Sequence, residues 1–200
     1  MSYQKTYNLK VSSMKKTILT VTSLLFLLMG IEACSLKNLQ FLSGPKPITE
    51  AEVHEAQKIW GDGIVAIGNA FTNKEDYKTL ATNHVDTLYA YDEGTVLFKP
   101  TKAAAQQFRL SKMDAISYFV TGVVPEDHGF ALQPWSAVRF ENADIIIDAD
   151  SAVAMGNYFF TDANTGKEAK AEFTFGYVRG ADGKLLINVH HSAFPYHPSH

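Results

Sequence analysis

Cysteine is almost absent from this chain, since Cys34 is the only one among 200 residues. A single cysteine excludes an internal disulfide framework and any zinc site built from clustered cysteines. A basic excess is also lacking: 18 Lys and Arg stand against 21 Asp and Glu, and four of the lysines lie within residues 1–34. The remainder is acidic, which argues against a nucleic-acid partner. The sequence also lacks a phosphate loop, a dinucleotide fingerprint and a nucleophile elbow.

The composition that is present predicts one globular domain, with 46% hydrophobic and 20% charged residues. Thr49 and Glu52 form a capping box ahead of a long amphipathic helix whose apolar stripe continues to Phe71. Two shorter helices are expected over residues 74–83 and 112–120. Helices followed by a sheet predict an α+β fold. Strands are expected at Asp86–Tyr91, Thr95–Lys99, Trp135–Glu141, Ala143–Asp148, Ala152–Thr161, Ala169–Arg179 and Leu185–Ala193.

The segment Thr17–Ile31 is the only long apolar run, and Lys15 and Lys16 stand directly before it. A short basic region, a short apolar stretch and small residues at its end are typical of an export signal. The run is shorter than the roughly 20 residues that a membrane span needs. We therefore expect residues 1–34 to be a signal peptide, with Met14 as an alternative start of the chain.

Cys34 ends this segment, and Ile31-Glu32-Ala33-Cys34 resembles a bacterial lipobox, in which the cysteine is lipidated. Glu32 departs from that pattern, so simple cleavage after Ser35 is the alternative. Both alternatives predict export from a bacterial cytoplasm, to the periplasm or to a lipid anchor on the membrane. Residues 35–48 are then a tether, and residues 49–197 are the folded domain.

Taken in order, the parts resemble the nuclear-transport-factor-2-like (SnoaL-like) cone fold, and most closely the bacterial relatives of the calcium/calmodulin-dependent kinase II association domain. This resemblance implies a long helix and two shorter ones packed on a strongly curved antiparallel sheet, with a pocket between them. Members of this superfamily use that pocket as an active site or as a binding cavity in self-associating modules, so the fold alone does not choose a function. The residues that carry the resemblance are Trp60–Ile64, Thr95–Thr101, Ser117–Phe119, Asp182–Lys184, His190–Ser192 and Pro195.

Aromatic and charged side chains on the expected helix and strands are the candidates for lining this pocket. Successive strand residues face opposite sides, so only one of His190 and His191 can enter the pocket, and His191 alternates with Ile187. Each aromatic candidate equally suits packing of the helix on the sheet, and a histidine here equally suits a hydrogen-bonded sheet position. The candidate pocket residues are Trp60, Tyr89, Trp135, Arg139, Tyr158, Tyr177 and His191.

Arg139 alternates with Trp135 and Ala137 on an apolar strand, so it either pairs with an acidic guest in the cavity or lies at an edge. We expect no metal site, because neighbouring histidines on a strand diverge and His197 and His200 lie in a tail that contains proline. We also expect no cofactor.

For enzyme chemistry, the candidates are carboxylates and tyrosines near the first expected strand, with His191 opposite them. They have no diagnostic spacing, so whether the chain is an enzyme stays open. These residues are Asp86, Tyr89, Tyr91 and Asp92.

The sequence therefore predicts an exported, lipid-anchored or periplasmic cone-fold protein that binds a small ligand or a partner in its cavity. It is expected to self-associate as a homodimer through the outer face of the sheet. The alternative is a small cofactor-independent enzyme, an isomerase, dehydratase or hydrolase, that uses the same cavity. A buried carboxylate within hydrogen-bond reach of His191 or of a tyrosine would favour the enzyme.

Overall fold

The computed structural model describes residues 46–198. The expected signal peptide, the lipobox cysteine Cys34 and most of the expected tether lie outside the described residues. Within residues 46–198, no helix is both long enough and apolar enough to span a membrane. The structure contains one copy of the chain, so the expected homodimer stays a prediction.

The first helix, α2, runs from Glu50 to Thr72, as the sequence predicts. The Thr49 side chain accepts a hydrogen bond from the Glu52 backbone N–H, and the Glu52 carboxylate accepts one from the Thr49 backbone N–H at 2.9 Å. This reciprocal capping satisfies two of the backbone donors that a helix start leaves unpaired. The apolar stripe faces the sheet and buries Val53, Trp60 and Ile64 among others.

The second helix, α3, spans Tyr77–Leu88 and a 3₁₀ turn, η1, follows at Ala90–Asp92. The expected strand Asp86–Tyr91 is therefore wrong. Ala81, His84 and Val85 are buried at the spacing of one helix face, so the helix continues past residue 83. The turn at Asp92-Glu93-Gly94, which would have joined two expected strands into a hairpin, is absent as such, because the next strand, β1 at Leu97–Lys99, pairs with β5 at the far end of the chain.

Helix α4 covers Lys112–Val120, which confirms the prediction, and a 3₁₀ turn, η2, follows at Phe130–Leu132. Four long strands complete the chain. They are β2 at Trp135–Ile147, β3 at Ser151–Asp162, β4 at Glu168–Arg179 and β5 at Leu185–Ala193.

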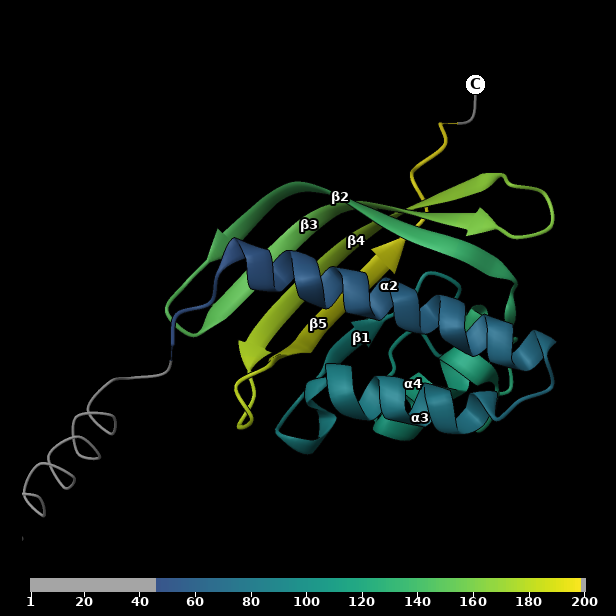
Figure 1. The fold of residues 1–200 in the computed structure, drawn as a ribbon, viewed down its shortest axis with the longest axis horizontal. Helices are drawn as coiled ribbons and strands as arrows, with labels where there is room; N and C mark the ends of the chain where they lie inside the picture. Colours follow the sequence, from purple (N-terminus) through teal and green to yellow (C-terminus); the bar gives the residue numbers. More distant parts are fainter. Residues whose placement is uncertain (1–45, 199–200) are drawn as a thin grey trace, which may run out of the picture. The chain divides into compact units, whose positions relative to one another are not determined.

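The five strands form one sheet in the order β1-β5-β4-β3-β2. Strands β2 to β5 are antiparallel neighbours, whereas β1 lies parallel to β5 at the edge. The helix α2 lies across the sheet, and α3 and α4 lie beside it near β1 and β5 (Figure 1). The α+β cone architecture expected from the sequence is confirmed, with one parallel pair in an otherwise antiparallel sheet.

Three bulges interrupt the register of the sheet. Ser136 and Ala143 are extra residues on β2 relative to β3, so the two strands expected between Trp135 and Asp148 are one strand. Asn188 is an extra residue on β5, because Ile187 pairs with Tyr177 while Val189 pairs with Gly176. An extra residue reverses which face the following side chains occupy. This reversal decides which residues of β2 and β5 face the core.

Candidate active site

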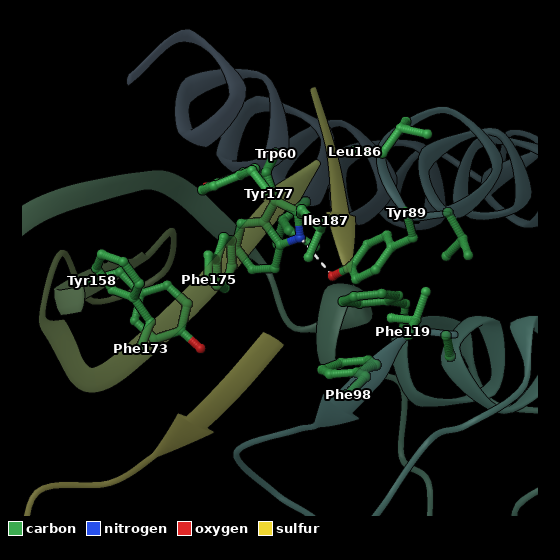
Figure 2. Close-up of a cluster of buried hydrophobic side chains, with 14 of the residues drawn as sticks. Trp60, Tyr89, Phe98, Phe119, Tyr158, Phe173, Phe175, Tyr177, Leu186 and Ile187 are labelled. Carbon is green, nitrogen blue, oxygen red and sulfur yellow. Dashed lines mark hydrogen bonds between the residues drawn. The ribbon is translucent and has the colours of Figure 1, made fainter. Parts of the chain in front are cut away.

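A chain of three buried polar groups crosses the space between α2 and the sheet. The Trp60 indole Nε1–H donates to the Tyr89 hydroxyl at 2.9 Å, and that hydroxyl lies 2.9 Å from Nδ1 of His190 (Figure 2 shows the Trp60–Tyr89 bond). A phenol carries one hydrogen, and Tyr89 already accepts from Trp60. A buried hydroxyl stays satisfied only if it donates to His190 Nδ1, which places the imidazole hydrogen on Nε2.

The His190 ring is enclosed by aromatic rings. It stacks on Phe98, its partner across the β1–β5 pair, with the ring centroids 4.5 Å apart, and meets Phe175 edge-on at 4.2 Å. Burial in these apolar surroundings lowers the pKa of His190 well below its usual value, because the charged ring would lose its hydration. Nε2 of His190 has no hydrogen-bond partner within the described part of the chain. His190 is therefore a neutral ring with one unused donor.

Four hydroxyl groups gather two residues further along β5, at Ser192. Ser192 follows His190 on the same face of β5, and its Oγ contacts both Thr101 Oγ1 and the Tyr158 hydroxyl. The Tyr118 hydroxyl accepts a hydrogen bond from the Lys102 backbone N–H at 3.4 Å and is also bonded to Thr101. We call Thr101, Tyr118, Tyr158 and Ser192 the hydroxyl cluster.

The hydroxyl cluster carries no charge at neutral pH. Burial raises the pKa of Tyr158 to about 12, and it also raises the pKa of Tyr118. Each tyrosine thus keeps its hydrogen, and so do the serine and threonine hydroxyls. Neutral donors in a dry site stabilise negative charge that develops on a bound molecule more strongly than water-exposed donors do. The arrangement suits a reaction that creates a carboxylate or oxyanion.

Two small cavities border the hydroxyl cluster. One, of about 110 Å³, is bordered by Tyr118, and the other, of about 90 Å³, is bordered by Thr101. They share Lys102, Phe130 and Gln133. Both are well below the roughly 300–1,000 Å³ of pockets for drug-sized ligands, so the site fits a molecule of a few atoms.

A larger hollow, of about 590 Å³, is an open groove between α2 and β2. None of the hydroxyl cluster lines that groove, so we place the chemistry at the two small cavities.

A second buried histidine stands behind Trp60. His84 of α3 lies 6.0 Å from Trp60 and 5.6 Å from Phe119, measured between ring centroids. Burial lowers its pKa to about 3, so it is neutral at physiological pH. Gly63 makes this position possible, because a Cβ there would lie 2.2 Å from His84 Nδ1.

Three of the residues predicted from the sequence meet in this region: Trp60 and Tyr89 in the polar chain, and Tyr158 in the hydroxyl cluster. Trp135 is buried beside the smaller cavity and donates to the Phe130 carbonyl oxygen at 3.1 Å. Tyr177 is buried on β4, and within residues 46–198 no hydrogen bond links it to the hydroxyl cluster.

Two predicted residues lie on the opposite face, away from the cavities. Arg139 is exposed, pairs with Glu141 and Glu168, and lies over the Phe159 ring at 4.1 Å. His191 is exposed as well. The physical reason is the same for both. The bulge at Ser136 breaks the alternation of Arg139 with Trp135, and the bulge at Asn188 breaks that of His191 with Ile187.

The sequence reasoning missed most of the hydroxyl cluster and the role of His190. Ser192 stands two residues from His190 on one strand, which is a local signal that both share a face. Thr101 and Tyr118 carry no such signal, because Thr101 contacts Ser192 across 91 residues and Tyr118 is bonded to Thr101 from a separate helix. Within residues 46–198, no group of three His, Cys, Asp or Glu side chains gathers as a metal site would require.

A family model described as "Metal-independent carbonic anhydrase" matches residues 51–194. A protein of that name from Nostoc sp. is 42% identical over 156 residues, which cover 76% of each chain. The crystal structure of an iota-carbonic anhydrase from a cyanobacterium, in complex with bicarbonate, is 40% identical with a TM-score of 0.75. It covers 78% of this chain and 98% of that chain. An NTF2-like protein from Novosphingobium aromaticivorans is 13% identical with a TM-score of 0.48, over 81% of this chain and 86% of that one.

These comparisons correct the main sequence-based expectation, a protein that binds a ligand or partner in its cavity, in favour of the alternative, a small enzyme, because the matching relatives are named as enzymes. They also give no support to the lipoprotein prediction. The expected cone fold holds, but the family is more specific than the association-domain branch. With a family model that matches most of its length and a relative at 42% identity, the chain belongs to the metal-independent carbonic anhydrase family.

Proposed function

We propose that this protein interconverts CO₂ and bicarbonate without a bound metal ion. The observation that carries the proposal is the hydroxyl cluster beside His190, a set of neutral buried donors at cavities of about 110 and 90 Å³. Two comparisons support it: family membership, and the bicarbonate found in the crystal structure of the cyanobacterial relative. The alternative expected from the sequence, a small cofactor-independent enzyme, is thereby narrowed to one reaction.

The chemistry follows from the donors. Water attacks the carbon of CO₂, a C–O bond forms, and one C=O electron pair moves onto oxygen as negative charge. Tyr118 and Thr101 line the two cavities and would donate to these oxygens, and Ser192 and Tyr158 are linked to Thr101 by hydrogen bonds. Donors that are already oriented need no reorganisation as the charge develops. The proton of the attacking water leaves the site, and bicarbonate remains.

The donor state of His190 is part of this proposal. The chain Trp60→Tyr89→His190 fixes the hydrogen on Nε2, and burial keeps the ring uncharged. A neutral donor stabilises bicarbonate without holding it as tightly as a cation would, which allows release of the product.

The test is stopped-flow CO₂ hydration by the full chain after dialysis against a strong chelator, with the metal content measured by mass spectrometry. We expect activity at negligible metal content. The Ser192→Ala and Tyr158→Phe variants should each lose about a hundredfold in kcat/KM, as removal of one such donor typically costs. The matched control is Tyr196→Phe, because Tyr196 is 83% exposed and lies outside both cavities.

Two outcomes would contradict the proposal. One is absence of CO₂ hydration by the folded, full chain. The other is activity that disappears with the chelator and returns only with added metal. The protein would then still hydrate CO₂, but it would need a metal ion to do so.

We also propose that the protein is exported, on the support of the apolar run Thr17–Ile31 and the two lysines before it. Cell fractionation of the full chain tests this, with a variant that lacks Thr17–Ile31 as the control. Equal cytoplasmic recovery of both chains would overturn it.

A further inference from the structure

The proposed reaction releases one proton for each CO₂ hydrated, and the buried site has no group that holds it. Burial lowers the pKa of both His84 and His190, so neither ring readily takes a proton. The tyrosines of the hydroxyl cluster are already protonated, because burial raises their pKa. The proton must therefore leave the site in each turnover, along a path to solvent.

The cavity of about 110 Å³ offers such a path. It is lined at one end by Tyr118, which is 5% exposed, and it is also lined by the solvent-exposed His128. Its volume holds a few water molecules, which together with the Tyr118 hydroxyl can pass a proton by exchange of hydrogen bonds. It is thus a polar connection between the hydroxyl cluster and the surface.

The other charged groups around this cavity are already committed to other partners. The Glu126 carboxylate accepts hydrogen bonds from the backbone N–H groups of Ala104, Ala105 and Gln106, at 3.2, 2.8 and 3.1 Å. These bonds hold its pKa below the usual value, which makes it a poor proton acceptor near neutral pH.

Asp127 and Lys102 are equally unsuited. Asp127 is paired with the fully buried Arg109 at 2.6 Å, and Arg109 also lies 3.6 Å from Glu126. The Lys102 ammonium has no lone pair to accept a proton, and it donates to Gln133 at 3.4 Å. Of the side chains that line the cavity, His128 alone combines exposure to solvent with an imidazole ring, which can both accept and donate a proton.

We propose that His128 is the proton-transfer residue of this enzyme. A water molecule in the cavity passes the released proton to a ring nitrogen of His128, and the imidazolium then gives that proton to buffer outside. One N–H bond forms and one breaks in each cycle, and no other group changes its charge. This inference rests on the proposed function.

The test compares the full-length wild type with His128→Gln, in CO₂ hydration at low and at high buffer concentration. At low buffer concentration, we expect the kcat of the variant to fall roughly ten- to a hundredfold. A positioned proton-transfer group typically contributes about a hundredfold or more, and buffer replaces part of that contribution. Its kcat/KM should stay unchanged, because bond formation to CO₂ precedes the transfer to solvent. Added imidazole should restore kcat. The matched control is His54→Gln, since His54 is exposed on the distant groove of α2 and should retain wild-type kinetics.

The possible outcomes separate the two proposals. If the wild type hydrates CO₂ and His128→Gln retains its kcat at low buffer, the proton-transfer proposal is wrong and the proposed function stands. A parallel loss in kcat and kcat/KM that imidazole does not restore shows a structural role for His128 and also overturns the inference. If the folded wild type has no CO₂ hydration activity at all, the proposed function fails, and the role of His128 fails with it.

Discussion

The two faces of the sheet carry the same residue types in different chemical states. His190 is 2% exposed on the inner face and bonded to Tyr89, whereas the next residue, His191, is exposed to solvent on the outer face. Arginine shows a similar contrast: Arg109 is fully buried and paired with Asp127, while Arg139 is paired with carboxylates at the surface. Burial, rather than residue identity, therefore decides which side chains become neutral donors or rigid supports.

The arginines give the largest expected difference. Arg109→Met should lower the free energy of unfolding by about 3–5 kcal/mol, because it leaves the Asp127 carboxylate buried without its partner. Arg139→Met should have a far smaller effect, because exposed ion pairs contribute little to stability. Urea unfolding of both variants measures the two values. Similar losses for the two would mean that the contrast between buried and exposed pairs does not hold in this domain.

The histidines test the same contrast in catalysis. His190→Asn removes the Nε2–H donor, and we expect kcat/KM for CO₂ hydration to fall by about a hundredfold or more. His191→Asn changes an exposed side chain on the other face and should keep wild-type kinetics. Circular dichroism checks that both variants are folded. Loss of activity in His191→Asn with full activity in His190→Asn would reverse the assignment of the two faces.

The bulge that separates these histidines can be tested directly. Gly176 lies opposite it, and a Cβ there would lie 2.8 Å from Asn188 Oδ1 and 2.9 Å from Val189 Cβ. Gly176→Ala should therefore cost about 1–3 kcal/mol of stability and should lower activity, because His190 and Ser192 follow the bulge. Gly94→Ala is the matched control, since a Cβ there meets no atom within 4 Å, and it should change stability by less than about 0.5 kcal/mol. An unaltered Gly176→Ala protein would show that the bulge has room to relax.

The smallest expected effect, when it is measured over a single pH unit, is a pH dependence of stability. His84 has a folded-state pKa of about 3, against 6.5 in the unfolded chain, so below pH 6.5 the unfolded state binds more protons. The contribution of His84 to the free energy of unfolding is therefore present in full above pH 6.5, and it is lost as the pH drops from 6.5 towards 3. The slope should be on the order of 1 kcal/mol per pH unit for such a histidine. Unfolding of His84→Leu at several pH values should show a shallower slope than that of the wild type, and an equal slope would contradict the burial of a neutral His84.

The sequence predicts the helices well where local signals mark them. The Thr49–Glu52 capping box and the apolar stripe identify α2, and α4 and β5 have the expected bounds. The end of α3 carries no such mark, and the aromatic residues Tyr89 and Tyr91 after it resemble a strand. Helical burial of His84 and Val85 against Trp60 and its neighbours outweighed that local preference.

The face of each strand residue is harder to predict, and it decided the outcome for the candidate site. A bulge is a mismatch between two strands, so neither strand's own sequence reveals it. Strict alternation placed His191 inwards and left Arg139 either in the cavity or at an edge. The extra residues Ser136 and Asn188 turn both side chains outwards, and Arg139 lies on the edge strand β2. The hydroxyl cluster was missed for a related reason, because its members come from four separate segments of the chain.

The parallel pairing of β1 with β5 also has a consequence for folding kinetics. Thr101 and Ser192 are 91 residues apart in the chain, and their contact exists only after the last strand has docked beside β1. Contacts between such distant segments are slow to form, because a long loop must close before they are made. A chain emerging from the ribosome can form α2 and the β2–β4 meander early, but the candidate active site forms last. Under the proposed function, enzymatic activity therefore appears only when the whole domain has folded.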